Sequence, residues 1–342
     1  MFKILCIDGG GMRGVIPAKV LALVEEALEH QGRHKRLCDC FDLICGTSTG
    51  SIIATGLALG MSARNILRLY RACARDIFPP LSPVKKLLRL VSKKPLYERQ
   101  ALSTALRTAF DQAAQATPAT LGHAHTRLCI PTYDLTLART RLLRNYASGE
   151  AQADRYIAAA DAALASSAAP GYFNSYSIEF DVPAGQTVEK RRYAKLIDNG
   201  AAANTPLLTA YFEAVETLGV PPQELAICSL GTGDFTFDNA PDEVFARYWF
   251  YYKPHRGAKA QQMAFGNLLL TSQSTTADTL MHHLQGSGSH PRFVYQRLQY
   301  DFGSHELVPF DTSKPKYLDL MEQMGKKVYE AQGEQALQTF FT

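Results

Sequence analysis

The chain has 342 residues, of which 46% are hydrophobic and 20% are charged. This composition can fill one large core or two ordinary ones, and it excludes general disorder, a collagen-like chain and a disulfide-stapled miniprotein. The 36 Lys and Arg against 32 Asp and Glu leave a net charge of +4, which is too small to indicate a DNA- or RNA-binding protein.

Two strand–turn–helix units occupy the start of the sequence. An apolar run over residues 3–7 predicts a strand, glycines interrupt it, and apolar residues at helical spacing predict a helix over Val15–His30. A second strand is expected over residues 41–45, and small apolar residues predict a packed helix over residues 49–59. Two such units in succession predict an α/β fold, in which a parallel sheet carries helices on its faces.

Strands and helices continue to alternate along the rest of the chain. Further strands are expected over residues 127–133, 141–146, 193–197 and 224–229, and helices over residues 154–167, 207–218, 242–252, 258–284 and 316–331. The alanine-rich stretch 113–120 is expected to be a linker. No Pro/Gly-rich segment sets the later residues apart, so we expect a catalytic core over 1–235 and a mainly helical extension, 236–342, packed on it.

A Gly-x-Ser-x-Gly pentapeptide joins the second predicted strand to its helix. Its members are Gly46, Thr47, Ser48, Thr49 and Gly50. A tight turn at this place raises the serine hydroxyl above the end of the sheet, and the following helix directs its N-terminal dipole toward that hydroxyl. The context favours a nucleophile elbow with Ser48 as nucleophile, against the alternative of a small-residue turn that only packs a helix closely.

A run of glycines separates the first predicted strand from its helix. It contains Gly9, Gly10, Gly11, Arg13 and Gly14, and formally matches the Gly-x-Gly-x-x-Gly pattern of dinucleotide-binding proteins. The second strand, however, does not end in the acidic residue that would hold a ribose. Bare backbone N–H groups at a helix N-terminus favour an oxyanion-binding loop, with Arg13 adding positive charge. A dinucleotide-dependent oxidoreductase and a purely structural turn remain the alternatives.

A serine nucleophile needs a base, and the histidines of the sequence offer no obvious partner. Asp198 follows a predicted strand and precedes Asn199 and Gly200. A carboxylate at the end of a strand can accept the serine proton directly when burial raises its pKa. An aspartate that only stabilises a turn is the structural alternative. The sequence therefore makes Asp198 the candidate base.

Taken in order, these motifs resemble those of the patatin-like phospholipase family. The matching segments are residues 8–14, 46–50, 165–173, 198–200 and 229–233. Five motifs in the family's order make the resemblance specific, and it covers residues 3–235. The resemblance implies a three-layer α/β/α fold with a mainly parallel central sheet, followed by the helical extension.

The resemblance also implies a serine–aspartate dyad that works without histidine and without a cofactor. Ser48 would attack the acyl carbonyl of a membrane glycerophospholipid, and Asp198 would act first as base and then as acid. The amides of the glycine loop, together with Arg13, would hold the oxyanion. Asn199 stands where the family has a glycine, and because Asn tolerates left-handed backbone angles, we expect the turn to be kept.

A lipid hydrolase has to reach a membrane surface. Residues 81–96, which run from Leu81 to Leu96, carry five Lys and Arg side chains among leucines. They predict a short basic amphipathic helix that lies on anionic headgroups, with a solvated surface helix as the alternative. Prolines on both sides favour a bounded cap over the site. We expect peripheral contact with membrane phospholipids.

Some bacterial members of the family are effectors that cyclic nucleotides activate in antiphage defence, and this chain is compatible with that group. The candidate contacts to a phosphate-bearing activator are Arg247, Tyr248, Lys253, His255 and Arg256. A structural pair of helices is the alternative for this region.

The cysteine pattern bears on the compartment and on metals. Seven cysteines with no Cys-x-x-Cys pair predict reduced thiols in a cytoplasmic protein. His30, His34, Cys38 and Cys40 are spaced only loosely like metal ligands, so loop positions are favoured and no catalytic metal is expected. The sequence leaves open a homo-oligomer, and also a non-catalytic lipid-binding protein with an unused elbow.

Overall fold

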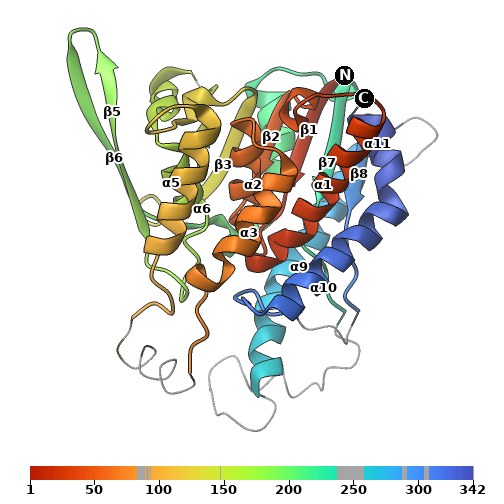
Figure 1. The fold of residues 1–342 in the computed structure, drawn as a ribbon. Coiled ribbons are helices and arrows are strands. Elements are labelled where there is room, and N and C mark those ends of the chain that lie inside the picture. The colour runs from red at the N-terminus through yellow and green to blue at the C-terminus, as the bar shows by residue number, and fades with distance from the viewer. Residues whose placement is uncertain are drawn as a thin grey trace.

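A central β-sheet lies between two layers of helices in the computed structural model of the chain (Figure 1). The structure describes residues 1–82, 89, 92, 94–146, 148–236, 258–286, 291–303 and 308–341. The helix expected over 242–252 lies outside these residues, as does most of segment 81–96. Within the described ranges, no helix is both long enough and apolar enough to cross a bilayer.

The sheet has the strand order β5-β6-β3-β2-β1-β7-β8, with β4 paired to β3 off this path. The strands are β1 Phe2–Ile7, β2 Leu43–Gly46, β3 Arg127–Asp134, β4 Arg139–Arg144, β5 Tyr176–Ala184, β6 Thr187–Asp198, β7 Leu225–Leu230 and β8 Val294–Leu298. From β3 through β2, β1 and β7 to β8, neighbouring strands are parallel, whereas β4, β5 and β6 pair antiparallel. The β5–β6 hairpin extends away from the body of the molecule (Figure 1).

Nine named α-helices lie within the described ranges. They are α1 Val15–His30, α2 Thr49–Ala58, α3 Ala63–Ile77, α5 Gln100–Ala114, α6 Ala159–Ser166, α7 Leu207–Phe212, α9 Ala258–Gln285, α10 Pro315–Val328 and α11 Glu334–Phe340. Short 3-10 turns cover Gly11–Gly14, Leu37–Cys40, Leu121–His123, Gly149–Tyr156, Asn199–Ala201 and Pro222–Glu224, and π turns extend α7 over Glu213–Thr217 and α10 over Tyr329–Gly333.

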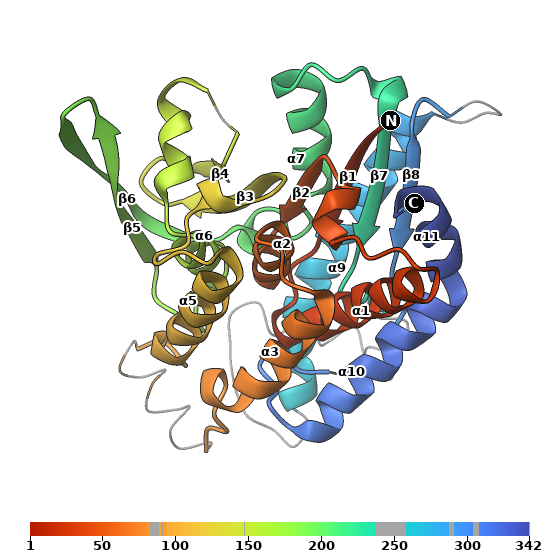
Figure 2. The ribbon, with the colours of Figure 1, turned by 45° about the horizontal axis from the view of Figure 1, so that its top comes forward.

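Both faces of the central strands are buried, which is why these strands read as unbroken apolar runs. In β1, Leu5 and Ile7 belong to the core shared with α1, α2 and α3, while Ile4 and Cys6 pack against α7. Figure 2 shows α7 on the side of the sheet opposite α1 and α2. The expected three-layer α/β/α fold with a mainly parallel sheet and a helical C-terminal end is confirmed.

Several elements differ from the sequence-based expectation: α3, α5 and β5 were not expected, and the expected linker 113–120 begins inside α5. The helix expected over 154–167 begins only at Ala159, because Ala158 pairs with Thr120 as an isolated bridge and the Ala159 N–H donates to the Ala119 carbonyl at 2.8 Å. This pairing with the segment before β3 replaces the first helical turns. The mainly helical extension after residue 235 also contains β8, which was not among the expected strands and which pairs with β7 to widen the sheet.

The carboxyl ends of parallel strands meet at one edge of a sheet, where ligands usually bind. The glycine loop follows β1, the Ser48 turn follows β2, and the loop at Thr232 follows β7. The antiparallel strand β6 ends beside them, with Asp198 opposite Thr132 of β3. The fold therefore gathers the candidate residues at a single edge.

Candidate active site

Ser48 stands at the turn between β2 and α2. Its backbone angles, φ 54° and ψ −126°, lie in the left-handed half of the map that non-glycine residues rarely adopt. A Cβ atom on Gly46 would lie 2.2 Å from the carbonyl oxygen of Gly50, and one on Gly50 would lie 2.3 Å from that of Ile7. The turn thus requires both glycines of the pentapeptide, and it presents a strained serine at the end of the sheet.

Ser48 and Asp198 lie within hydrogen-bond distance, although 150 residues separate them in the sequence. The Ser48 hydroxyl donates to Asp198 Oδ2 at 2.5 Å, and the Gly200 N–H donates to Asp198 Oδ1 at 2.7 Å. Both side chains are buried. Burial raises the pKa of Asp198 to about 6, although the hydrogen bonds from Ser48 and Gly200 partly oppose this rise. A carboxylate with such a pKa is suited to accept and return a proton near neutral pH.

Residues of the 165–173 motif accept hydrogen bonds from the backbone N–H groups of both Ser48 and Asp198. The Ser48 N–H donates to Ser166 Oγ at 3.0 Å, and the Ser166 hydroxyl donates to the Pro131 carbonyl at 2.7 Å. The Asp198 N–H donates to the Ala168 carbonyl at 3.1 Å. The sequence shows this motif but no role for Ser166, because the partners of Ser166 are distant in the chain.

Asn199 keeps the turn after Asp198 by a route that differs from the expectation. Its backbone lies in the 3-10 turn Asn199–Ala201, and it is not among the residues with positive φ. Its side chain instead accepts from Thr140 Oγ1 at 3.0 Å and donates to the Ala203 carbonyl at 3.0 Å. The tolerance of Asn for left-handed angles is therefore not what this position uses.

The glycine loop passes directly against the serine. A Cβ atom on Gly9 would lie 2.9 Å from the Ser48 Cβ. The Gly9 N–H donates to the Asn204 carbonyl at 3.1 Å. Among the described residues, the N–H groups of Gly10 and Gly11 have no acceptor. The loop that packs against Ser48 through Gly9 therefore carries two amides without an acceptor among the described residues, and such amides are what an oxyanion hole requires.

The side chain of Arg13 lies in an aromatic environment. Its guanidinium lies 4.0 Å from the ring centre of Phe310, 5.1 Å from that of Phe235 and 5.8 Å from that of Phe302. Burial lowers the pKa of Arg13 to about 9. Within the described part of the chain, its Nε and Nη1 have no hydrogen-bond acceptor. The observed contacts of Arg13 are thus with rings and not with Ser48 or Asp198.

Gly14, the last glycine of the loop, packs against Tyr70. A Cβ atom on Gly14 would lie 2.7 Å from Tyr70 Oη. Its absent side chain makes room for Tyr70, whose hydroxyl donates to the Thr49 carbonyl in the first turn of α2 at 2.9 Å. Gly14 is therefore placed by packing against α3.

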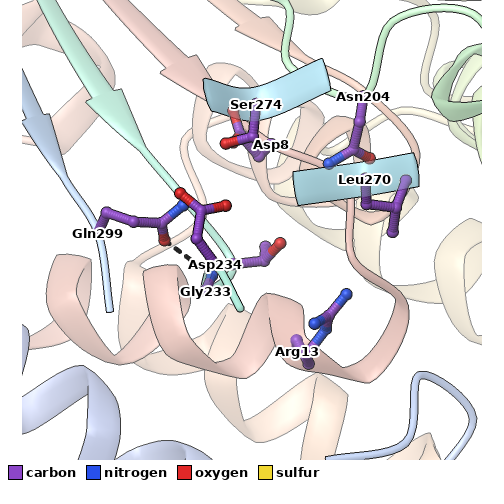
Figure 3. A pocket seen from close by; sticks show the side chains of 9 residues that line it. Asp8, Arg13, Asn204, Gly233, Asp234, Leu270, Ser274 and Gln299 are labelled. Carbon is purple, nitrogen blue, oxygen red and sulfur yellow. Dashed lines mark hydrogen bonds between the residues drawn. The ribbon is translucent and has the colours of Figure 1, made fainter. Parts of the chain in front are cut away.

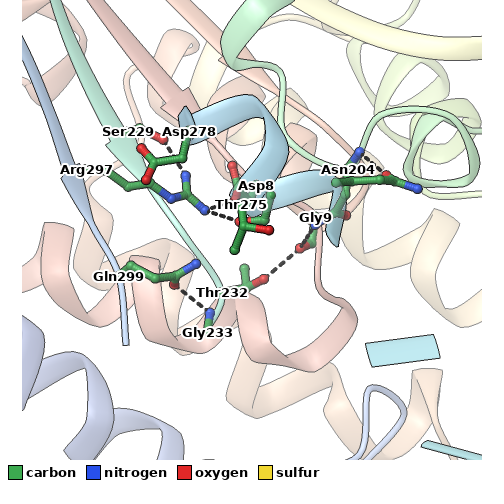
Figure 4. A network of polar contacts seen from close by, with 12 residues as sticks. Asp8, Gly9, Asn204, Ser229, Thr232, Gly233, Thr275, Asp278, Arg297 and Gln299 are labelled. Carbon is green, nitrogen blue, oxygen red and sulfur yellow. Dashed lines mark hydrogen bonds and ion pairs between the residues drawn. The ribbon is translucent and has the colours of Figure 1, made fainter. Parts of the chain in front are cut away.

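A buried polar network lies behind the glycine loop. Figure 3 shows Arg13, Asp234 and Gln299 around a narrow space beside Asp8. Arg297 of β8 donates to Asp8 Oδ2, and also to the hydroxyls of Ser229 and Ser274, each at 2.6 Å (Figure 4).

This ion pair anchors the residue that opens the loop. The Arg297 and Asp8 side chains are only 7% and 1% exposed. Burial by itself lowers the pKa of Arg297, but Asp8 and Asp234 raise it overall. A charged residue of the C-terminal region therefore fixes the start of the oxyanion loop.

Three other expectations from the sequence concern a metal, a phosphate-bearing activator and a ribose. In the ranges that the structure covers, no three or more His, Cys, Asp or Glu side chains are grouped to hold a metal ion. The candidate activator contacts, Arg247, Tyr248, Lys253, His255 and Arg256, lie outside the described residues. The second strand leads into the Ser48 turn, and not into an acidic residue that would hold a ribose.

Comparison with known proteins places these features in a family. A family model described as patatin-like phospholipase matches residues 5–211, more than half of the chain. A cGAMP-activated phospholipase from Escherichia coli (strain TW11681) is 29% identical over 256 residues, which cover 73% of this chain and 67% of that protein.

Two further relatives show similar identity over shorter stretches. A cGAMP-activated phospholipase from Vibrio cholerae is 32% identical over 212 residues, covering 60% of this chain and 55% of that protein. Patatin-like protein 2 from Oryza sativa subsp. indica is 32% identical over 222 residues, which cover 61% of this chain and 52% of that protein. The chain spans between half and two thirds of the length of these relatives. With a family model that matches most of the strands and turns around Ser48, the chain belongs to the patatin-like phospholipase family.

Proposed function

We propose that the chain is a serine acyl hydrolase that cleaves fatty-acyl esters of membrane glycerophospholipids, with Ser48 as nucleophile and Asp198 as its base. The observation that carries this proposal is the 2.5 Å hydrogen bond between Ser48 Oγ and Asp198 Oδ2 at a strained turn. Membership of the family supports the reaction class. The formation of this bond also argues against a non-catalytic lipid-binding protein.

The geometry supports a two-step acyl transfer. As Ser48 Oγ attacks the ester carbonyl, its proton passes to Asp198 and the carbonyl electron pair becomes an oxyanion facing the amides of Gly10 and Gly11. The intermediate collapses to an acyl-enzyme, and Asp198 returns the proton to the lysolipid alkoxide. Water then attacks the acyl-enzyme with Asp198 again as base, which releases the fatty acid and regenerates Ser48. No step uses a histidine or a cofactor.

Within this proposal residues 1–235 carry the reacting groups, and residues 236–342 form an extension that supports them. The extension supplies Arg297, and it supplies Phe310, whose carbonyl accepts from the Met12 N–H at 2.8 Å. Both residues contact the segment that opens with the glycine loop. The extension thereby contributes to the loop without contributing a reacting group.

We extend the proposal to the place of action and its control. Two relatives carry names that describe them as cGAMP-activated phospholipases. By that likeness this chain is a cytoplasmic enzyme that acts peripherally at the membrane through residues 81–96, and a cyclic nucleotide activates it in antiviral defence. The net charge of +4 is compatible with attraction to anionic lipid.

The direct test measures fatty-acid release from phospholipid liposomes, with and without cGAMP. We expect Ser48→Ala and Asp198→Ala to lower the rate by about 10³-fold or more, since each removes a member of one catalytic unit. Asp154→Asn is a matched control, because Asp154 is a buried carboxyl bound to Tyr193 Oη at 2.8 Å outside the proposed site. Wild-type rates in both site variants would refute the hydrolase. Equal rates with and without cGAMP would refute only the activation.

A further inference from the structure

Two side chains hold the carbonyl group of Gly9 in the oxyanion loop. Asn204 Nδ2 donates to the Gly9 oxygen at 3.0 Å, and Thr232 Oγ1 donates to the same oxygen at 2.6 Å. Both side chains are buried. Figure 4 shows Asn204 and Thr232 on either side of Gly9, with Thr232 joined to it by a dashed line. The lone pairs of this carbonyl are therefore both engaged.

The direction of the next amide follows from this arrangement. A trans peptide group is planar, so its C=O and the N–H of the following residue point in opposite directions. The two bonds to the Gly9 oxygen thus fix where the Gly10 N–H points, which is away from Asn204 and Thr232. That N–H is one of the two amides without an acceptor among the described residues of the loop.

Close packing opposes a flip of the peptide group between Gly9 and Gly10. A Cβ atom on Gly10 would lie 2.4 Å from Thr232 Oγ1, and one on Gly9 would lie 2.5 Å from Asn204 Oδ1. The two polar side chains therefore occupy the space that a side chain on either glycine would need. A peptide flip would leave the Gly9 carbonyl buried without its donors, which costs roughly 1–3 kcal/mol for such a group.

The same contacts tie the loop to the segment that carries the base. Asn204 follows Asp198 by one short turn, and its carbonyl accepts from the Gly9 N–H at 3.1 Å. Its own N–H donates to Gln273 Oε1 of α9 at 2.7 Å. Thr232 comes from the end of β7, next to β1 in the sheet. The direction of the Gly10 N–H is thereby fixed relative to Asp198, because the segment that follows Asp198 holds the preceding residue, Gly9.

We propose that Asn204 and Thr232 are positioning residues, which aim the Gly10 N–H at the oxyanion that forms when Ser48 attacks an ester. This inference rests on the hydrolase proposed above and names two residues that act through the backbone of Gly9. An amide fixed before the reaction needs no reorganisation when charge develops, and this is the source of its catalytic effect.

The variants separate the hydrogen bonds from packing. Thr232→Val removes the hydroxyl with little change of shape, and Asn204→Leu removes the amide with the same branching. We expect each to lower kcat about 10-fold, and the pair about 100-fold, which is the order of losing one oxyanion donor. KM stays unchanged, and Thr232→Ser, which retains the hydroxyl, keeps most of kcat. Thr55→Val is the matched control, because Thr55 is buried in α2 and its hydroxyl has no acceptor among the described residues.

A second measurement reports on the oxyanion itself. An alkyl trifluoromethyl ketone accepts the Ser48 hydroxyl at its carbonyl carbon, the proton passes to Asp198, and the carbonyl electron pair becomes a stable oxyanion. We expect the inhibition constant of this ketone to rise in proportion to the fall in kcat/KM in the two variants. The inhibition constant of an ether phospholipid, which lacks a carbonyl group, stays constant, as does the inflection of the pH–rate profile near pH 6.

The outcomes distinguish the positioning role of Asn204 and Thr232 from the serine hydrolase on which it rests. Wild-type kcat in folded Thr232→Val and Asn204→Leu, alongside an inactive Ser48→Ala, overturns the positioning role alone. Equal losses in Thr232→Ser and Thr232→Val also overturn it, because packing and not the hydroxyl would then matter. Full activity of Ser48→Ala overturns the hydrolase, and the positioning role with it.

Discussion

Asp198 carries a carboxyl group that folding makes harder to ionise. Its pKa is about 6 in the folded chain, against 3.8 for an ordinary aspartate, chiefly because it is buried. Between these pH values the folded chain holds a proton that the unfolded chain has released. The free energy of unfolding therefore falls as pH rises through this window, and it stays lower above it. The ionised base costs about 3 kcal/mol at neutral pH for a pKa difference of that size.

We predict that Asp198→Asn is more stable than the wild type at pH 8, although it is inactive. The neutral amide avoids the cost of a buried carboxylate, and the expected gain in Tm is roughly 4 °C for a chain of this size. The gain shrinks toward pH 4, where the wild-type carboxyl is protonated in the folded state. Thermal denaturation followed by circular dichroism at several pH values measures it. A variant less stable than the wild type at pH 8 contradicts the prediction.

The position of α2 decides whether the elbow can form. The helix begins directly after Ser48, and Gly50 in its first turn lies against the backbone oxygens of Ile7 and Asp8, so that an added Cβ would lie only 2.3 and 2.6 Å from them. Neither oxygen can move easily, because Ile7 ends a central strand and the Asp8 N–H, in the next residue, donates to the Leu230 carbonyl of β7 at 3.0 Å. Gly56 in the same helix faces only side-chain atoms of Ile66 and Met61 at 3.1 Å or more.

We predict opposite results for two glycine-to-alanine changes in this helix. Gly50→Ala destabilises the chain by about 3 kcal/mol or more and abolishes hydrolysis, because the helix has to move away from β1. Gly56→Ala stays within about 1 kcal/mol of the wild type, since the gain in helix propensity offsets a small shift of flexible side chains. Urea unfolding and fatty-acid release provide the two readouts. Similar losses in both variants would show that helix position does not control the turn.

Elements and residues with local signals could be predicted from the sequence, and those defined by distant partners could not. Helix α1 has the predicted bounds Val15–His30, because glycines lie on both sides of its apolar stripe. Strand β8 was not expected, since the strand that it pairs with, β7, lies far back in the chain. Helix α3 was missed although its sequence carries a local signal. Ser62 is a typical N-cap residue, and its hydroxyl accepts from the Asn65 N–H at 3.1 Å.

The same distinction applies to the site. Ser48 and Asp198 stand in short motifs at strand ends, so sequence spacing was enough to name them. Asn204 and Thr232 act on the Gly9 carbonyl 195 and 223 residues away, and no local pattern reveals such contacts. The surroundings of Arg13 depend likewise on aromatic rings that come from several distant segments.

At the scale of the whole molecule, the sheet joins the two ends of the chain. Strand β1 pairs with β7, and β7 pairs with β8, so Arg297 reaches the carboxyl end of β1. There it meets Asp8, whose Oδ1 has no partner within the described residues. The family model covers Asp8 but ends at residue 211, so Arg297 lies beyond it. The late part of the chain is therefore structurally part of the active-site edge.

We predict that Arg297→Met destabilises the chain by about 3–5 kcal/mol, because it leaves Asp8 as a buried charge without its partner. Asp8→Asn combined with Arg297→Met recovers a large part of that loss, since neither charge then remains. Chemical denaturation of the two single variants and the double variant gives the coupling energy. Additive losses would show that the ion pair is not a unit.

The late position of Arg297 and Phe310 has a consequence during translation. A ribosome that has delivered the first 235 residues has made Ser48 and Asp198, but neither of the two groups that secure the start of the glycine loop. Domains generally fold in the order of synthesis, so a nascent chain of this length holds Ser48, Asp198 and the two side chains that donate to Gly9 before Asp8 and Met12 have their late partners. The segment from Asp8 to Met12 therefore has all of its described partners only after Phe310, near the last tenth of the polypeptide, has been made.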